Sequence, residues 1–354
     1  MLLEGWIPTA EAQSLESALD RGDYYCRKLE ISDEDDIPIE LKNNRFNRLF
    51  EPITRLYSLP NAHEFDSTPL FAPFFMLFFG ICFGDGGYGL LLLLLGTLMK
   101  RKAKADMKPI LSLLQCFGIA TLVVGTLSGS FFGVNIAEIP ALASVKRYFL
   151  TSDNIMTLSL VIGFIHVLYG KFVAAMKVKV QRGLKYSLAA FAWVFLILAL
   201  ALAVGLPMMN IHLPQPVVYA LYGVAGVGAL IAFFYNSPGK NVFLNFGSGI
   251  WATYNTASGL LGDTLSYIRL YAIGLTGSLL GGVFNTMAVD MTATMPIWVR
   301  WLPMLLILLV GHALNIGLSM VSSLVHPMRL IYVEYYKNSE FEGGGTAYAP
   351  FRKI

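Results

Sequence analysis

Six hydrophilic side chains recur along residues 300–337, the last apolar block of the sequence. They are three, four, three, four and three residues apart, which places them on one face of an α-helix: His312, Asn315, Ser319, Ser322, His326 and Arg329. In a membrane such a face contacts another helix or a water-filled cavity, because lipid cannot hydrogen-bond polar groups. A dry helix–helix seam remains the alternative, but two titratable histidines and a fixed charge favour a hydrated ion path. Pro327 is expected to loosen this helix near its cytoplasmic end.

A second charge, Arg269, lies inside the apolar block 264–290. An arginine at the bilayer centre costs roughly 2.5–3.5 kcal/mol on the most lenient scale, so it needs a functional reason. The same block contains four glycines that leave a smooth helix surface: Gly274, Gly277, Gly281 and Gly282. Static helix packing and a surface that slides past another helix explain these glycines equally well.

Three acidic residues are further candidates to assist ion passage: Asp85, Asp263 and Glu334. Asp85 stands in Gly84–Gly89, where stabilising a turn is favoured over relaying a proton. Asp263, shortly before Arg269, is suited to pairing with a basic group or to capping a helix. His166, on an apolar face, is interpreted as a satisfied core residue.

Motifs for catalysis or cofactor binding are not found. The segment Gly84–Gly89 lacks the strand that a phosphate-binding loop requires, and the sequence has no G-x-x-x-x-G-K-[ST] motif. A Ser130–His312 protease dyad is disfavoured because no nucleophile motif accompanies it. Cys26, Cys82 and Cys116 are too scattered for disulfides or a metal site. We therefore expect no catalytic activity of its own, no metal, no cofactor and no nucleic-acid partner.

Composition predicts the class of protein that holds these residues. Hydrophobic residues make up 55% of the 354 residues and charged residues 14%, against about 25% charged residues in soluble domains. Apolar blocks long enough to cross a bilayer occur at 69–99, 109–133, 153–177, 183–207, 215–235, 264–290 and 300–337. The sequence thus predicts an all-α, polytopic membrane helix bundle without a cleaved signal peptide.

The distribution of Lys and Arg predicts the orientation. Loop 100–108 contains five Lys and Arg residues and loop 178–186 three, with Lys177 beside it, whereas 208–214 has none and 134–152 has only Lys146 and Arg147. If loop 100–108 and the N-terminus are both cytoplasmic, block 69–99 must turn back at Gly84–Gly89. We interpret it as a short hairpin, against one ordinary span as the alternative. This gives about eight spans, with both termini cytoplasmic.

Two regions follow from this pattern. Residues 1–69 are charged and Pro-punctuated, and are interpreted as the cytoplasmic remnant of a soluble domain with its connector. Residues 70–354 are the transmembrane domain. The polar stretch 241–263 is expected to be a half-buried lead-in to the helix that follows.

Four motifs resemble one known family. They are LEGWIP at 3–8, PLFAPFFMLFFGICFGDGGYG at 69–89, GDTLSYIRLYAIGL at 262–275 and HPMRLIYVEYYKNSEFEGGGTAYAPF at 326–351. In this order they resemble the membrane half of subunit I, or subunit a, of V-type rotary ATPases. The resemblance implies a stator subunit beside a rotating ring of small c/K-type membrane subunits. It also implies peripheral-stalk subunits, the membrane-facing subunit of the central stalk and lipid as partners.

The resemblance also implies roles for individual residues. Arg269 matches the essential arginine of the family and Arg329 its second arginine, on two long, tilted helices that carry proton or sodium. The chain departs from the family in two respects. Family members usually begin with a long cytoplasmic arm, and we expect either that this chain is a fragment or that the arm is encoded separately. Eukaryotic relatives also carry an acid near Ser319. We expect a prokaryotic plasma-membrane protein.

The residues alone leave two alternative functions to consider. A stand-alone secondary transporter is disfavoured, because such folds show paired broken helices and only one break occurs here. A non-transporting assembly scaffold is the third. Co-purification with a ring of small subunits separates the three.

Overall fold

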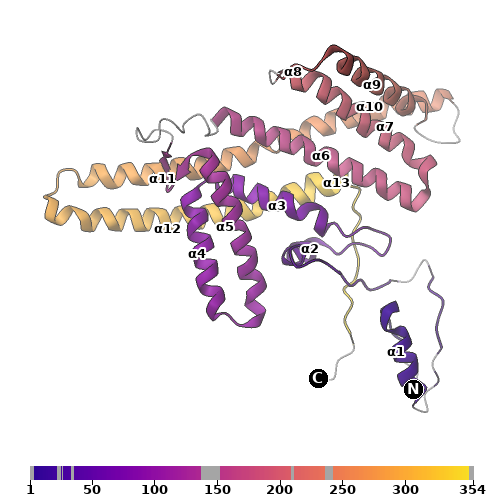
Figure 1. Cartoon of the computed structure of the whole chain (residues 1–354), viewed down its shortest axis with the longest axis horizontal. Coiled ribbons are helices and arrows are strands. Elements are labelled where there is room, and N and C mark those ends of the chain that lie inside the picture. The colour runs from indigo at the N-terminus through magenta and orange to yellow at the C-terminus, as the bar shows by residue number, and fades with distance from the viewer. Residues whose placement is uncertain are drawn as a thin grey trace.

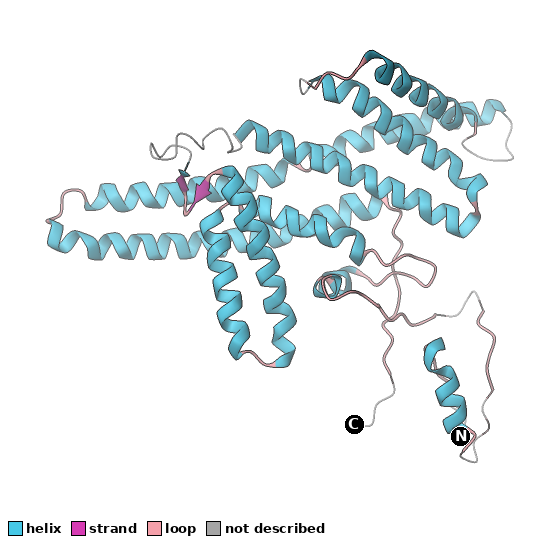
Figure 2. Cartoon of the chain, in the orientation of Figure 1, coloured by secondary structure: helices cyan, strands magenta, loops and turns pink. Residues whose placement is uncertain are grey.

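The computed structural model describes residues 4–21, 25, 27–32, 36–136, 152–208, 211–235 and 242–350. These residues are mostly helical, with connecting loops and one short two-stranded ribbon (Figure 2). The predicted all-α class is confirmed. Cys26, Lys146 and Arg147 lie outside the described residues, whereas Cys82 and Cys116 are free thiols.

The first half of the chain contains short elements and a helix break after Phe83. They are α1 (Thr9–Leu19), η1 (Asn47–Leu49), α2 (Glu51–Tyr57), α3 (Thr68–Phe83), α4 (Gly86–Lys102), η2 (Ala105–Met107), α5 (Lys108–Ser128), β1 (Ser130–Phe131) and β2 (Val134–Asn135).

The second half consists of long helices with two π-helical turns, η6 and η7. Its elements are α6 (Ser152–Arg182), α7 (Leu184–Leu200), η6 (Ala201–Gly205), α8 (Leu206–Met208), α9 (Gln215–Phe234), α10 (Val242–Leu265), α11 (Ile268–Thr292), α12 (Ile297–Arg329), η7 (Leu330–Tyr335) and α13 (Tyr336–Asn338).

Six helical stretches within the described residues are long and apolar enough to cross a membrane. They are Ala105–Ser128, Asp153–Arg182, Leu184–Met208, Gln215–Phe234, Asn245–Thr292 and Ile297–Asn338. The shorter helices α3 and α4, with 16 and 17 residues, correspond to the two arms expected in block 69–99. The polar lead-in expected at 241–263 is itself a helix, α10.

Helix α3 forms the centre of the bundle. Its phenylalanines Phe71, Phe75, Phe78 and Phe79 are fully buried, and α3 packs against α5, α11 and α12. Pro69 in its first turn suits a helix start, and Gly84 ends it in the left-handed region at φ 64°. A helix too short to cross a bilayer alone is thus enclosed by protein.

The break at Gly84 and Asp85 confirms the expected interruption, but the two arms do not pack against each other as a tight hairpin predicts. The arms α3 and α4 hardly touch, and α4 lies along α5 instead (Figure 1). Glycines on the facing sides of α4 and α5 bring the two backbones together: a Cβ on Gly89 would lie 2.4 Å from the Leu122 nitrogen, and one on Gly118 2.8 Å from the Leu93 nitrogen. The bulky phenylalanines of α3 offer α4 no comparable surface.

Helices α11 and α12 form a long antiparallel pair that extends from the remaining bundle (Figure 1). They have 25 and 33 residues, so their expected length is confirmed, and their tilt stays a prediction. On the other side, α7 packs between α6 and α9, and α10 contacts α6 and α9.

The N-terminal region divides into two parts. Helix α1 has no buried residue. Residues 39–59, by contrast, pair with the C-terminal segment: the Ile39 amide donates to the Thr346 carbonyl at 2.8 Å, and the Gly345 amide to the Leu59 carbonyl at 3.1 Å. The connector and the C-terminal segment therefore meet at one end of the bundle.

Candidate functional site

The polar face predicted for residues 300–337 lies on α12 and faces α11. Asn315 and Ser319 are buried, whereas Leu314 and Leu318 on the other side are 57% and 62% exposed. We call the row of polar side chains from His312 to Arg329 the stripe. Glycines of α11 allow the stripe to pack closely, since a Cβ at Gly277 would lie 3.1 Å from the Ser319 Oγ. Close packing therefore accounts for this glycine within the described chain.

One end of the stripe is closed by hydrogen bonds. His312 Nδ1 shares a hydrogen bond of 2.6 Å with the Tyr88 hydroxyl of α4, and His312 Nε2 lies 3.1 Å from Asn285 Oδ1 of α11. Asn315 Nδ2 donates to the Tyr88 hydroxyl at 3.0 Å and to the Gly277 carbonyl at 2.8 Å. This half has the character of a seam joining α4, α11 and α12. Tyr88 and Asn285 were not predicted as site residues.

Asp85 holds the break between α3 and α4 together. Its fully buried carboxylate accepts hydrogen bonds from four backbone amides at 2.8–3.1 Å and from the Ser130 hydroxyl at 2.9 Å. Two of the amides, Gly87 and Tyr88, begin α4, so Asp85 is an N-cap. The other two, Phe132 and Gly133, belong to the turn between β1 and β2. This geometry is that of the turn-stabilising role favoured above.

At the other end of the stripe, several buried polar atoms lack a hydrogen-bond partner in the described chain, and we call this end the open half. Buried polar atoms without a partner in the described chain gather on α11, α12 and η7: Arg269 Nη1, Ser323 Oγ, His326 Nδ1 and Glu334 Oε2. Buried polar groups are normally hydrogen-bonded, so such a cluster calls for water or an outside partner. Ser323, fully buried, was missed because its neighbour Ser322 fits the helical spacing better.

The two arginines lie on different helices near His326. Arg269 is half-buried in the first turn of α11, and Arg329 is exposed at the end of α12. Both positive charges act electrostatically on His326, and both act on Glu334 in η7. The structure thus brings together Arg269, Arg329, His326 and Glu334, while His312 and Asn315 lie in the closed half.

Asp263 is part of a structural ion pair. Its carboxylate lies 3.0 Å from Lys337 Nζ and accepts a 2.7 Å hydrogen bond from Asn338 Nδ2. Of the two roles left open by the sequence, pairing with a basic group or capping a helix, the structure shows the pairing. It fastens the end of α10 to α13, next to the open half of the stripe.

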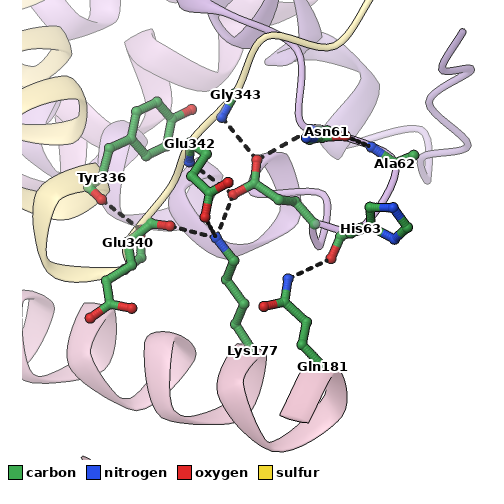
Figure 3. A network of polar contacts seen from close by, with 11 residues as sticks. Asn61, Ala62, His63, Lys177, Gln181, Tyr336, Glu340, Glu342 and Gly343 are labelled. Carbon is green, nitrogen blue, oxygen red and sulfur yellow. Dashed lines mark hydrogen bonds and ion pairs between the residues drawn. The ribbon is translucent and has the colours of Figure 1, made fainter. Parts of the chain in front are cut away.

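A polar network that the sequence did not reveal joins three distant segments (Figure 3). Lys177 of α6 contacts Glu64 Oε1 at 2.8 Å, Glu342 Oε1 at 3.1 Å and the Glu340 carbonyl at 2.7 Å. Beside it, Gln181 donates to the His63 carbonyl at 3.1 Å. The connector, the end of α6 and the C-terminal segment therefore meet at one place.

The carboxylate of Glu64 is stabilised in its ionised form. Burial raises its pKa, but hydrogen bonds from the amides of Glu342, Gly343 and Asn61 and from Lys177 outweigh this effect, and the net pKa lies below the ordinary value. Its side chain is only 4% exposed. The network is therefore a charged anchor for the C-terminal segment.

No group of three or more His, Cys, Asp and Glu side chains suited to a metal ion is present in the described ranges.

Comparison with known proteins finds one family model and several relatives that are similar to this chain. The V-type ATPase 116kDa subunit family matches residues 1–117. The chain is 29% identical to the A-type ATP synthase subunit I of Methanocaldococcus jannaschii, over 99% of this chain and 54% of the relative. It is also 29% identical to the V-type ATP synthase subunit I of Borreliella burgdorferi, over 99% of this chain and 60% of the relative.

The chain spans somewhat more than half the length of these curated relatives. The similarity covers 99% of this chain in both relatives. In sequence, and with its polytopic helical fold, this chain is therefore similar to subunit I of V-type and A-type ATP synthases.

Proposed function

We propose that this chain is the stator membrane subunit of a V-type rotary ATPase and forms half-channels for proton or sodium against a rotating ring. The observation that carries the proposal is the cluster of unpartnered buried polar atoms on Arg269, Ser323, His326 and Glu334. A dry seam would satisfy these atoms, as it does around His312. A water-filled path and a passing partner charge would satisfy them here.

Arg269 is proposed as the fixed charge that a ring carboxylate passes. Arginine stays protonated at any working pH, so it cannot relay the proton itself. At about 4 Å and an effective dielectric of about 20, the attraction to a carboxylate is near 4 kcal/mol. This lowers the pKa of the carboxylate, which favours release of its ion, and rotation can still break the pair. The same charge separates the two half-channels.

The stripe residues are proposed to carry the ion to and from this point. Ser322, His326 and Arg329 line the open half, with Glu334 beside them. His312, Asn315 and Ser319 close the other half through hydrogen bonds that a passing ion would exchange for its own. Eukaryotic relatives carry an acid near the position of Ser319. Because serine has no carboxylate, no carboxylate step is assigned there.

The partners and placement follow from this role. The exposed apolar faces of α11 and α12, with Leu279, Leu314 and Leu318, are proposed to meet the c/K-type ring and lipid. Residues 1–69 would meet the peripheral-stalk subunits and the membrane-facing subunit of the central stalk. The network around Lys177 supports a common cytoplasmic side for the connector, loop 178–186 and the C-terminus, in a prokaryotic plasma membrane with 70–354 as the translocation domain. The chain itself is proposed to be non-catalytic.

The proposal is tested with the chain expressed together with the other subunits of the ATP synthase. Co-purification with the ring, and ATP-driven ion uptake into vesicles that require this chain, are expected. Solute transport by vesicles that contain this chain alone would contradict the proposal and favour a secondary transporter.

A further inference from the structure

The start of α11 is set by a break two residues before Arg269. At this break the Ser266 amide donates to the Gly262 and Asp263 carbonyls, both at 3.2 Å, and the Tyr267 amide to the Thr264 carbonyl at 3.1 Å. The hydrogen-bond ladder of α10 therefore ends here, and α11 begins at Ile268. Such interruptions are where two helical segments change direction. Whatever holds Tyr267 thus determines where the first turn of α11, and Arg269 with it, is placed.

Tyr267 is held by a notch on α6. Gly163 and His166 are three residues apart, so they share one face of this helix. A Cβ at Gly163 would lie 2.3 Å from Tyr267 Cγ, so the ring fits only because this residue is glycine. The Tyr267 hydroxyl shares a 2.7 Å hydrogen bond with His166 Nδ1, and both side chains are fully buried.

The same imidazole touches the segment that follows Arg329. Its ring stacks on Tyr335 of η7, with centroids 4.9 Å apart and an interplanar angle of 15°. On its other sides Phe74 and Phe78 of α3 lie at centroid distances of 4.4 Å and 5.1 Å. His166 therefore lies between the segment that places Arg269 and the segment that carries Glu334, clamped by a helix at the centre of the bundle.

We propose that the notch formed by Gly163 and His166 is a positioning site, which holds Tyr267 and thereby fixes Arg269 at the distance its partner requires. This inference rests on the proposed function, in which Arg269 meets a ring carboxylate. Coulomb attraction falls with distance, and a shift from about 4 Å to about 6 Å removes about a third of it. His166 is thus a positioning residue that acts through Tyr267 and touches no ion.

The experiment measures ions taken up per ATP hydrolysed, in vesicles that hold the complete complex. The variants are Tyr267→Phe, His166→Leu, His166→Gln and the double variant Tyr267→Phe with His166→Leu. Tyr336→Phe is the matched control: this tyrosine is also buried, and its hydroxyl shares a 3.2 Å hydrogen bond with Ser67 away from the break. Arg269→Ala is assayed in the same series.

We expect Tyr267→Phe and His166→Leu each to lower the ratio about fivefold, the factor that one net hydrogen bond corresponds to. The double variant should be no worse than His166→Leu, because both remove the same contact. His166→Gln, which keeps a hydrogen-bonding side chain, should retain more than half of the parental ratio. A merely structural role would lower complex content, ATP hydrolysis and uptake together and leave the ratio unchanged.

Two results would overturn the inference and are distinguishable. Suppose that Tyr267→Phe, His166→Leu and His166→Gln all keep the parental ratio while Arg269→Ala loses uptake. The notch then does not position Arg269, and the proposed function stands. If Arg269→Ala retains uptake, the proposed function fails and the inference fails with it. Should His166→Leu not assemble, Tyr267→Phe decides, since it keeps the ring in the notch.

Discussion

The Tyr88 hydroxyl and His312 Nδ1 lie 2.6 Å apart although the two residues are separated by 224 positions in the chain. This contact joins the first residues of α4, which Asp85 caps, to the polar face of α12. It closes one end of the stripe, and the unpartnered atoms around Arg269 lie at the other end.

Tyr88→Phe is expected to destabilise the complex by about 1–3 kcal/mol, because Asn315 and His312 lose a buried partner. The measurement is the thermal midpoint of the detergent-solubilised complex. Tyr219→Phe is the matched control, since Tyr219 of α9 is 70% exposed and should leave the midpoint unchanged. An unchanged midpoint for Tyr88→Phe would contradict the seam described for the closed half.

Asp85→Asn is expected to prevent or strongly reduce assembly. The amide would direct a donor at groups that are all donors, leaving buried amides unpaired at a cost of about 3 kcal/mol or more. Subunit content after purification checks this, with the exposed Asp106→Asn as control. An Asp85→Asn complex that assembles at parental level but no longer transports ions would instead indicate a proton relay.

Glu64→Gln tests the charged anchor of the C-terminal segment. Because the pKa of Glu64 is lowered in the folded chain, the ionised form stabilises the fold above the unfolded pKa, about 4.3, and this stabilisation is lost as the pH falls through the folded value. The variant should lose about 2 kcal/mol near pH 7.

The difference between parent and Glu64→Gln should shrink as the pH is lowered toward 4 and below. Thermal midpoints at a series of pH values measure it. Glu16→Gln, on the exposed face of α1, is the control and should follow the parent throughout. A difference that stays constant down to pH 3 would show that the charge of Glu64 does not hold the network.

Cysteine reactivity tests the division of the α12 stripe. Cysteines at Ser322 and His326 should react with small hydrophilic thiol reagents, because the open half contains water. Cysteines at Leu314 and Leu318 should not, since these positions face lipid or the ring. Position 315, closed by Tyr88, should react more slowly than position 326. Equal protection at all five positions would favour a dry seam along the whole helix.

Much of this architecture is predictable from the sequence, because hydropathy and helical spacing are local properties. The apolar blocks, the break at Asp85 and the common face of Asn315 and Ser319 all followed from them. The packing partners did not. Glycines of α5 that receive α4 become informative only once the two helices are known to touch, so the sequence did not show that α4 packs along α5 rather than along α3.

Contacts between distant residues were equally hidden. Tyr88, His166 and Lys177 are single polar residues in apolar or basic surroundings, and nothing in their own segments names Asn315, Tyr267 or Glu64 as partners. His166 was interpreted as a satisfied core residue, yet its Nε2 has no partner in the described chain. A tyrosine next to a break in a membrane helix was the available signal for this site.

The most direct test of the central claim is ATP-driven ion uptake by vesicles that hold the reassembled complex with Arg269→Ala, with subunit content checked by gel. We expect uptake to be lost while assembly is largely kept, because the half-buried charge is a cost to insertion. Arg269→Lys should also lose most uptake, since lysine lacks the planar, permanently charged guanidinium. Arg329→Ala should be milder, as Arg329 is exposed, and Arg300→Ala, a matched arginine at the other end of α12, should behave like the parent. Uptake close to the parental rate in Arg269→Ala would contradict the assignment of this residue and the mechanism built on it.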